Sequence, residues 1–474
     1  MAARSIVVVG AGPCGLACAR TLRALGHQAF TVLEAAPVAG GLAGSVVDAQ
    51  GFTWDHGGHV VFSHYGEFDR LLVDAMGDEL LHHDRSSFVH VAHVAQVGHV
   101  AHGAGGGDEV VGAWVPYPYQ LHLHHLPPEE AEEALVGLVG AAATPAAAVP
   151  GQDFAAWMLR AFGSGITRQF MRPYNEKVWA HPPESMAAGW IAERVAEAPW
   201  RQALAAYVHR RDQVWGPNHS FAFPAQGGTG EIYRRAARGL GDAVRFDAPV
   251  EHVAVADRVV TAGGQAYPYD RLVWTGALDA LIGLLDHAPD HVRAAAGQLV
   301  ANEVTVVGIG YEEPLRDERS WLYFPEADVP FYRATNFAKY SPAHVPGGRT
   351  DLYSSWMTET AHSAQRPLGT HGLPTAADLP AAVDAALKRV GVVPPFARVA
   401  SVHVQHLPRA YPVPTLGRDA ALAVIQPWLM AHGIYSRGRF GAWRYELGNM
   451  DHAVKMGADV AHLLVNGTAE AAWA

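Results

Sequence analysis

The chain is poor in cysteine, in charged residues and in long apolar runs. Its 474 residues include two cysteines, Cys14 and Cys18, which excludes a disulfide-stapled scaffold and a cysteine-rich metal site. No run of about 18 apolar residues occurs, so no membrane-spanning helix is expected. The net charge of −11 lacks the basic surplus of a general nucleic-acid binder. Any anionic ligand must therefore be held by a few local arginines.

The composition that remains is that of a large folded protein. Hydrophobic residues make up 49% of the chain, and its length allows roughly three domains. The first twelve residues do not resemble a signal peptide, so a reducing cytoplasm is the expected location. Cys14 and Cys18 lie four residues apart on a predicted helix and are expected to be small core residues. Histidine occurs 27 times, so no single histidine is informative by its presence, and no metal site is expected.

A strand, a glycine-rich turn and a helix open the chain. Residues 6–9 form an apolar strand, followed by Gly10-x-Gly12-Pro13-x-Gly15 and a helix predicted over 16–25. In this pattern the glycines allow a tight turn, close approach of a pyrophosphate and close helix packing. A second strand, 29–33, ends at Glu34, which is placed to bind a ribose hydroxyl. The opening therefore predicts a binding site for FAD or NAD.

Further glycines favour FAD over NAD. The pair Gly40-Gly41, followed by Leu42, comes soon after the ribose acid, as is typical of FAD enzymes. Residues 46–55 are predicted to form a hairpin, which leads into a loop with a second pair, Gly57-Gly58.

The order of β-rich and helical stretches predicts an α/β fold with a discontinuous, Rossmann-like FAD-binding domain. We assign residues 1–88, 211–280 and 400–474 to that domain. A helical domain is expected over 120–210, and an antiparallel β-sheet substrate domain over 89–119 and 281–399. Within the helical domain, the apolar residues at 154, 157, 158 and 162 recur at helical spacing and are expected to be core, and residues 163–165 are expected to separate two helices. The stretch 215–275 is predicted to be β-rich. Residues 103–108, inside an Ala/His-rich insert at 90–113, are expected to form a loop.

Several segments of the chain resemble UDP-galactopyranose mutases, most closely the eukaryotic type. The segment 54–65 reads WDHGGHVVFSHY and is similar to the histidine loop of that family. The resemblance continues, in family order, through residues 114–120, 170–180, 223–230, 321–325, 331–335, 411–416 and 436–449. These segments span nearly the whole chain.

The resemblance implies a set of site residues. The catalytic set is His59, Arg172 and Arg333. The substrate-binding set is Tyr117, Tyr119, Gln120, Asn175, Trp179, Trp321, Tyr323, Arg333, Tyr411 and Tyr445. The FAD-binding set is Gly10, Gly12, Pro13, Gly15, Glu34, Gly41, Leu42, Gly57, Gly58, His59, Arg439, Tyr445, Asn449 and Met450.

Chemistry also explains why these residue types belong there. A nucleotide diphosphate needs forked donors, which arginine supplies, and Arg172 and Arg333 are the implied clamp. Tyr117, Tyr119 and Gln120 offer aromatic faces for a base and an amide for its edge. His59 is expected to act through its backbone beside the flavin rather than as an acid or base.

The implied activity is an isomerase reaction with no net redox change. A UDP-hexopyranose, UDP-galactopyranose first among them, would become the hexofuranose through a covalent adduct between the sugar and N5 of reduced FAD. NADH or NADPH would reduce the flavin. The expected partner is a nucleotide sugar, with no nucleic acid and no membrane span, and a homo-oligomer stays open.

Alternatives and departures limit this interpretation. An oxidase of the amine-oxidase or protoporphyrinogen-oxidase type shares the opening pattern, but such enzymes usually place arginines near Gly40-Gly41, and residues 34–42 contain none. Loss of Arg172 or Arg333 would have supported a flavin-binding protein without catalysis, and neither is lost. Met450 and Trp200 depart from the family pattern, so a mutase for another nucleotide sugar also stays open.

Overall fold

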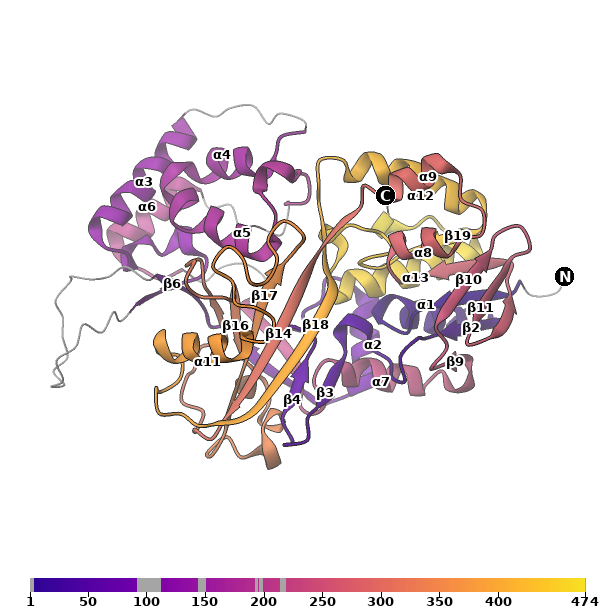
Figure 1. Cartoon of the computed structure of the whole chain (residues 1–474), viewed down its shortest axis with the longest axis horizontal. Coiled ribbons are helices and arrows are strands. Elements are labelled where there is room, and N and C mark those ends of the chain that lie inside the picture. The colour runs from indigo at the N-terminus through magenta and orange to yellow at the C-terminus, as the bar shows by residue number, and fades with distance from the viewer. Residues whose placement is uncertain are drawn as a thin grey trace.

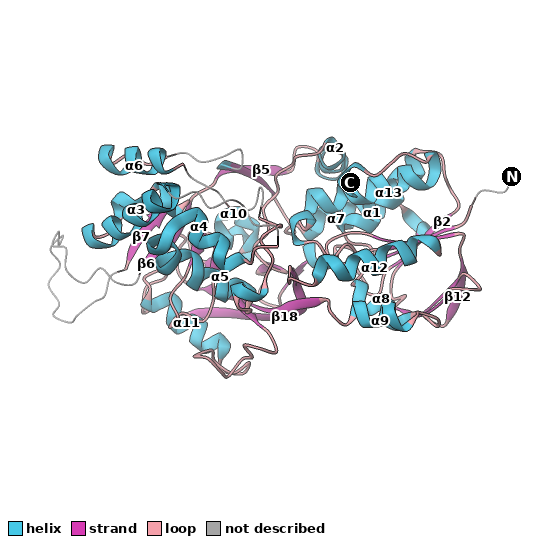
Figure 2. Cartoon of the chain, turned by 90° about the horizontal axis from the view of Figure 1, so that it is seen from above, coloured by secondary structure: helices cyan, strands magenta, loops and turns pink. Residues whose placement is uncertain are grey.

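The computed structural model describes residues 4–91, 112–143, 151–191, 195, 199–213 and 219–473. Its elements gather into two bodies that lie side by side (Figures 1 and 2). One contains both ends of the described chain. The other contains a large sheet with a group of helices above it in Figure 1. None of the helices in these ranges is long and apolar enough to cross a membrane.

The first body is built on a five-stranded parallel sheet in the order β19-β13-β1-β2-β9. Its strands are β1 (Ile6–Val9), β2 (Phe30–Leu33), β9 (Val244–Arg245), β13 (Arg271–Trp274) and β19 (Ile434–Ser436). The strands are apolar on both faces because both faces are covered, as is usual for parallel sheets.

One face of this sheet packs on four helices: α1 (Pro13–Ala24), α2 (Gly66–Met76), α7 (Gly230–Arg238) and α13 (Met450–Asn466). The other face packs on α8 (Leu278–Leu284), α9 (Asp290–Ala296), α12 (Arg418–Ala431) and a small antiparallel sheet. That sheet contains β10 (Val250–Ala254), β11 (Val259–Ala262) and β12 (Gln265–Pro268).

The second body is built on a seven-stranded sheet in the order β18-β14-β17-β16-β15-β6-β7. Its strands are β6 (Ser87–Val91), β7 (Ala113–Pro116), β14 (Val300–Tyr311), β15 (Trp321–Tyr323), β16 (Arg333–Asn336), β17 (Ser354–His362) and β18 (Val399–Val413). All pairings are antiparallel except that of β15 with β6. Short α10 (Phe337–Tyr340) follows β16, and α11 (Leu379–Arg389) packs against β14.

The helical group of the second body contains α3 (Pro128–Ala143), α4 (Phe154–Ile166), α5 (Arg172–Trp179) and α6 (Trp200–His209). The aromatic residues that recur at helical spacing in α4 are buried in one core, as predicted. Gly163 separates two helical segments within α4, as predicted, because its backbone is non-helical (φ 71°, ψ 179°) and kinks the helix there.

Several sequence predictions hold, with shifted bounds. The predicted hairpin over 46–55 is confirmed as β3 (Ser45–Val47) paired with β4 (Thr53–Asp55). The first helix starts at Pro13 rather than at residue 16, because proline is well suited to the first turn of a helix. The stretch 215–275, predicted to be β-rich, contains α7 besides its strands, including β8 (Ser220–Pro224), which pairs with β5 (Leu80–Asp84).

One predicted boundary disagrees with the observed pairing. β18 pairs along β14 over most of its length, so residues 400–413 extend the seven-stranded sheet and not the parallel one. Within the insert at 90–113, β6 and β7 pair with each other at its two ends. Residues 92–111, with the loop predicted at 103–108, lie outside the described residues.

Candidate active site

A cavity of about 1850 Å³ lies between the two bodies and continues from one into the other. A small-molecule site is usually about 300–1,000 Å³, so this cavity has room for two ligands. We call the part lined by Gly10, Gly12 and Glu34 the dinucleotide end, and the part lined by Tyr117, Tyr323 and Arg333 the aromatic end.

The dinucleotide end is formed by the turn between β1 and α1. Gly10 has a φ of +101°, and a Cβ on Gly15 would lie 1.9 Å from the carbonyl oxygen of Gly10. Gly15 therefore does not line the cavity but lets α1 start this close to β1. Gly12 is the N-cap of α1 and has no side chain that could bind the free N–H groups of the first turn. Gly12 and Pro13 line the cavity, so the positive end of the helix dipole faces it.

Glu34 stands at the end of β2, where the sequence predicts the ribose ligand. Its carboxylate accepts hydrogen bonds from the backbone N–H of Ala11 at 2.6 Å and of Ala36 at 2.9 Å. These bonds fix the acid against the glycine turn, and Glu34 lines the cavity beside Gly12, Pro13, Gly41 and Leu42.

The two cysteines lie on the inner side of α1, as predicted. Both are buried and free. Burial raises the pKa of Cys14 to about 12, so its thiol stays protonated near neutral pH and is a poor nucleophile.

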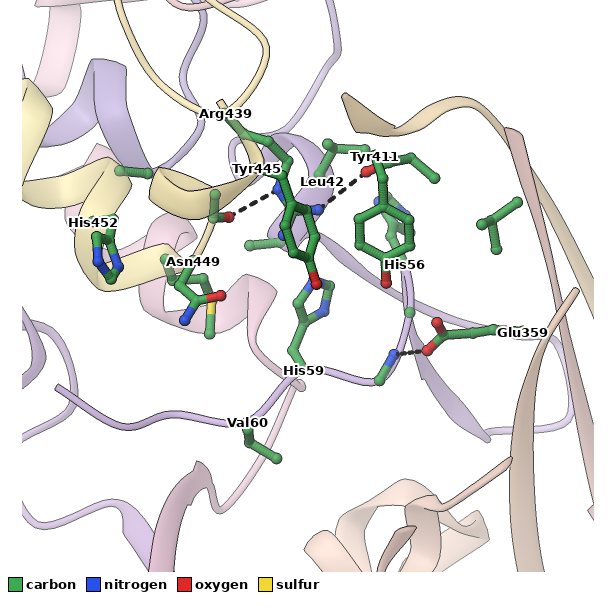
Figure 3. A pocket seen from close by; sticks show the side chains of 18 of the residues that line it. Leu42, His56, His59, Val60, Glu359, Tyr411, Arg439, Tyr445, Asn449 and His452 are labelled. Atoms are coloured by element: carbon green, nitrogen blue, oxygen red, sulfur yellow. Dashed lines mark hydrogen bonds between the residues drawn. The ribbon is translucent and has the colours of Figure 1, made fainter. Parts of the chain in front are cut away.

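The histidine loop, residues 55–60, crosses the middle of the cavity (Figure 3). Gly57 has a φ of +121°, and a Cβ on Gly58 would lie 2.6 Å from Oγ1 of Thr335. Larger residues would therefore push the loop off β16. The backbone N–H of Gly58 donates to Glu359 at 2.6 Å, which ties the loop to β17.

His59 follows these glycines with its imidazole in the cavity. Burial, helped by the nearby charge of Arg439, lowers the pKa of His59 to about 3, so the ring is neutral near neutral pH. Its Nδ1 lies 3.9 Å from Asp55 and has no hydrogen-bond partner among the described residues. This buried nitrogen is free to face a bound ring system.

The second cofactor segment comes from the C-terminal part of the chain. Arg439 donates to the carbonyl oxygens of Gly448 at 2.8 Å and Ala410 at 3.2 Å. These bonds hold the loop ahead of α13, whose N-cap is Asn449 and whose first residue is Met450. Figure 3 shows Arg439, Tyr445 and Asn449 on the side of the cavity that faces His59.

A buried ion pair connects the histidine loop to the aromatic end. Arg333 on β16 donates to Glu359 on β17, with Nη2 at 2.7 Å from Oε1, and its guanidinium lies 4.5 Å from the ring centre of Trp321. Tyr332 also donates to Glu359. Burial alone would raise the pKa of Glu359, but the charge of Arg333 holds it below the usual value. Glu359 is therefore an anion that contacts both Gly58 and Arg333.

Arg85 is a second guanidinium at the aromatic end, and sequence reasoning missed it. It lies 4.9 Å from the ring centre of Trp321 and 5.7 Å from that of Tyr117, and it donates to the hydroxyl of Tyr323 at 2.8 Å. Among the described residues it has no acidic partner within 4 Å. A partly buried cation in this position favours an anionic ligand.

Glu359 was missed as well, although a signal for it exists. β17 is buried along its whole length, and a lone glutamate in such a strand needs a cation beside it. No comparable signal marks Arg85, which lies in the two-residue connection between β5 and β6.

Most of the predicted site residues lie together in the cavity wall. The lining includes Gly10, Gly12, Pro13, Glu34, Gly41, Leu42, Gly57, Gly58, His59, Tyr117, Gln120, Asn175, Trp179, Trp321, Tyr323, Arg333, Tyr411, Arg439, Tyr445, Asn449 and Met450.

Besides Gly15, two of the predicted residues do not line the cavity. Arg172, at the start of α5, has a side chain that is 42% exposed and binds Glu176 at 2.9 Å and Glu184 at 2.8 Å. Tyr119 is buried, stacks on Phe170 and donates to Gln169 at 3.1 Å. Both residues use their polar groups within the helical part of the second body.

Trp200, one of the departures from the family pattern, also lies away from the cavity lining. It packs against the core of the helical group, with the guanidinium of Arg201 at 4.5 Å from a ring centre. It therefore does not fill space in the cavity.

Comparison with known proteins agrees with this geometry. Residues 13–398 match the sequence profile of a family described as flavin containing amine oxidoreductase. A solved structure of reduced UDP-galactopyranose mutase is 34% identical, with a TM-score of 0.91 over 100% of this chain and 96% of that one. A protein described as a protoporphyrinogen oxidase from Exiguobacterium (16% identity, TM-score 0.70) and a putrescine oxidase with bound putrescine (18%, 0.67) each match over 98% of this chain and 99% of theirs. The last two likenesses concern the fold alone.

The chain is therefore a member of the flavin-containing amine oxidoreductases, an α/β flavoprotein fold. Within that group it belongs to the UDP-galactopyranose mutase family and is an isomerase of that type.

FAD is the cofactor of this family, and the residues present fit it. The start of α1, whose N-cap Gly12 has no side chain to bind the free N–H groups, suits a pyrophosphate, and Glu34 suits a ribose. The buried Nδ1 of His59 and the start of α13 suit the ring system.

Proposed function

We propose that this protein interconverts the pyranose and furanose forms of a UDP-hexose, with UDP-galactose as the leading substrate, while its flavin is reduced. The observation that carries the proposal is the continuous cavity, which joins a dinucleotide end to an aromatic end with two partly buried guanidinium groups. When bound, reduced FAD supplies the nucleophile for the anomeric carbon of the sugar. The remaining requirements fall to this chain's own residues.

Two cations face the region proposed for the diphosphate. Arg85 has no acidic partner among the described residues, whereas Arg333 is already paired with Glu359. Arg85 is therefore expected to contribute more binding free energy to an anion than Arg333 does. Arg333 is expected to orient the anion, because Glu359 and Trp321 fix the position of its guanidinium. The clamp predicted as Arg172 and Arg333 is thus proposed to be Arg85 and Arg333.

The uridine is proposed to lie against Tyr117 and Gln120. Tyr117 offers an aromatic ring 5.1 Å from that of Tyr323, and Gln120 offers an amide at the cavity wall. An amide can both donate to and accept from the edge of a pyrimidine, which suits recognition of uracil.

The residues around the proposed reaction centre are proposed to stabilise charge and to orient the ligands, and not to transfer protons. The ring of His59 is neutral near neutral pH, so it is not an acid there, and the glycines before it fix the loop through Glu359. The N-terminal end of α13 faces the cavity, where its partial positive charge would stabilise an anionic reduced ring. Enclosure by aromatic side chains excludes water that would hydrolyse the sugar.

The test is to incubate the dithionite-reduced protein with UDP-galactose, UDP-glucose, GDP-mannose and dTDP-glucose, and to separate the products by chromatography. A furanose product from UDP-galactose, formed without oxygen and absent with oxidised protein, is the expected result. Stoichiometric oxygen uptake with an amine would instead favour an oxidase. Turnover of GDP-mannose alone would overturn the assignment of the base site. Parallel reductions with NADH and NADPH identify the reductant.

A further inference from the structure

Three groups of histidines and acids within the described residues lie close enough to share a cation, and one of them stands apart from the active site. Two of the groups contribute residues to the lining of the central cavity. The third consists of Glu303 on β14, His362 on β17 and His406 on β18, and none of its members lines that cavity. We call it the three-strand cluster.

The three-strand cluster is positioned by strand register. β14 lies between β17 and β18, with Glu303 opposite His362 and Thr305 opposite His406. Because side chains alternate along a strand, these residues point away from the face that carries Val304 and Leu407, which line the cavity. The cluster therefore lies behind the cavity wall, on the other face of the sheet.

The side chains converge on one oxygen atom. Nε2 of His406 lies 2.7 Å from Oε2 of Glu303, and Nδ1 of His362 lies 3.9 Å from the same oxygen. The two imidazole rings are stacked with centres 5.5 Å apart. All the potential ligand atoms lie within 4.8 Å of one another. Bonds of about 2.0–2.2 Å to one ion would bring these atoms to a tetrahedral arrangement with small side-chain movements.

The second ring nitrogen of His362 has a hydrogen-bond partner, as the second nitrogen of a metal-binding histidine usually does. Its Nε2 lies 3.0 Å from the hydroxyl of Thr305. When Nε2 donates to this hydroxyl, Nδ1 keeps its lone pair and faces Glu303. Such an outer hydrogen bond fixes the tautomer and the orientation of a metal-binding histidine.

We propose that Glu303, His362 and His406 form a zinc site. Two imidazoles and one carboxylate are a ligand set suited to Zn²⁺. The side chains of Glu303 and His406 are 37% and 53% exposed, so a water molecule can take the fourth position. No metal site was expected from the sequence, because the three ligands lie far apart along the chain and only the strand register brings them together.

Zinc at this site would connect β17 to β18 across β14. β17 carries Glu359 and β18 carries Tyr411, and both side chains contact Arg333. The ion would therefore stiffen the wall that holds Arg333 without touching the active site itself.

The test is zinc titration by calorimetry of the full-length, flavin-loaded protein after treatment with EDTA and dialysis. Other histidines can also bind zinc, so the readout is a difference between variants. The wild type is expected to bind one equivalent more than His406→Ala and one more than Glu303→Gln. His252→Ala, which removes an exposed histidine on β10, is the matched control and is expected to bind as the wild type does.

Substitution of Thr305 tests the outer contact. Thr305→Val keeps all three ligands and is expected to weaken the extra zinc site by roughly 10–100-fold, whereas Thr305→Ser is expected to retain it. An anomalous diffraction peak between His362 and His406 in zinc-soaked crystals would place the ion.

Equal zinc stoichiometry in the wild type, His406→Ala and Glu303→Gln would overturn the proposal. Neither this outcome nor its opposite bears on the mutase reaction, since the readout is the number of ions bound. The flavin content of each variant, measured by absorbance, shows that the protein is folded in every titration.

Discussion

The two ends of the cavity are built in different ways. At the dinucleotide end, Gly10, Gly12 and Glu34 lie within one short βαβ segment, and much of what they offer comes from the backbone. At the aromatic end, Arg85, Tyr117, Trp321 and Arg333 come from distant parts of the chain and meet through their side chains. The first end depends on local conformation, and the second depends on strand register and on the choice of ionic partners.

This difference means that single side chains at the aromatic end can be changed while the cofactor stays bound. The sharpest test is Glu359→Gln, which leaves the buried guanidinium of Arg333 without its counter-charge. Removing one partner of a buried ion pair costs about 3–5 kcal/mol. We expect a loss of that size in the free energy of unfolding, measured with urea in the absence of nucleotide.

Added UDP sharpens the same test. A diphosphate restores negative charge near Arg333, so UDP is expected to raise the melting temperature of Glu359→Gln more than that of the wild type. Glu312→Gln, which removes an exposed partner of Arg398, is the control and should cost at most about 1 kcal/mol. An unchanged stability of Glu359→Gln would mean that Arg333 does not depend on this pair.

The next test concerns Arg85, which has no acidic partner among the described residues. Arg85→Met keeps an unbranched apolar stem but removes the guanidinium, and with it a charge-assisted contact worth about 1.5–3 kcal/mol. UDP binding, measured by calorimetry, should weaken by roughly ten- to over a hundred-fold, while the amount of FAD released by acid stays normal. If the variant lost both its FAD and its UDP binding, the two ends of the cavity would not be independent of each other.

The histidine loop joins the two ends of the cavity. Because His59 lies in it, the stability of the folded protein is expected to depend on pH. His59 stays neutral in the folded protein down to a pH of about 3, because burial and Arg439 lower its pKa. The unfolded chain takes up a proton below its ordinary pKa of about 6.5. Below that pH the unfolded state binds more protons, so stability is lost as pH falls and is fully present above 6.5.

The expected size follows from the linkage relation. Each pH unit below 6.5 should cost about 1.4 kcal/mol, which amounts to about 2 kcal/mol at pH 5. Urea unfolding at pH 7.5 and pH 5 measures it, and His59→Gln should lose less stability between the two. Parallel losses in variant and wild type would mean that the imidazole accepts a proton in the folded state.

The smallest expected effect belongs to Arg172→Ala. Arg172 binds Glu176 and Glu184 at the surface, and exposed pairs of this kind contribute about 0–1 kcal/mol. UDP binding by the variant should stay within a few-fold of wild type. A loss comparable to that of Arg85→Met would mean that α5 moves its first residue into the cavity when the nucleotide binds.

The sequence predicted the dinucleotide end well for a physical reason. A glycine turn between a buried strand and a helix allows few conformations, so Gly10, Gly12 and Glu34 could be placed from their spacing alone. The hairpin over 46–55 and the aromatic core of α4 also follow from local pattern, and both are confirmed.

At the aromatic end, the sequence did not predict the cavity wall completely, because Arg172 and Tyr119 lie outside it and Arg85 lies within it. Which arginine enters a cavity depends on where acids lie in space, and Glu176 and Glu184 draw Arg172 away. Tyr119 was expected in the substrate site but lies outside the cavity lining. It starts a short helical turn after Pro118, and the sequence does not show which side of that turn faces the cavity. The pairing of β18 with β14 was missed because strands that pair across a long stretch of sequence leave no local signal.

Arg85 has a practical consequence for work with this protein. A guanidinium enclosed by Trp321 and Tyr117 attracts any small oxyanion that reaches it, including the sulfate or phosphate of common buffers. Such ions would compete with a nucleotide and make its apparent affinity fall as their concentration rises. Measurements in chloride-based buffers of fixed ionic strength, with sulfate added stepwise, would reveal how strongly the empty cavity retains inorganic anions.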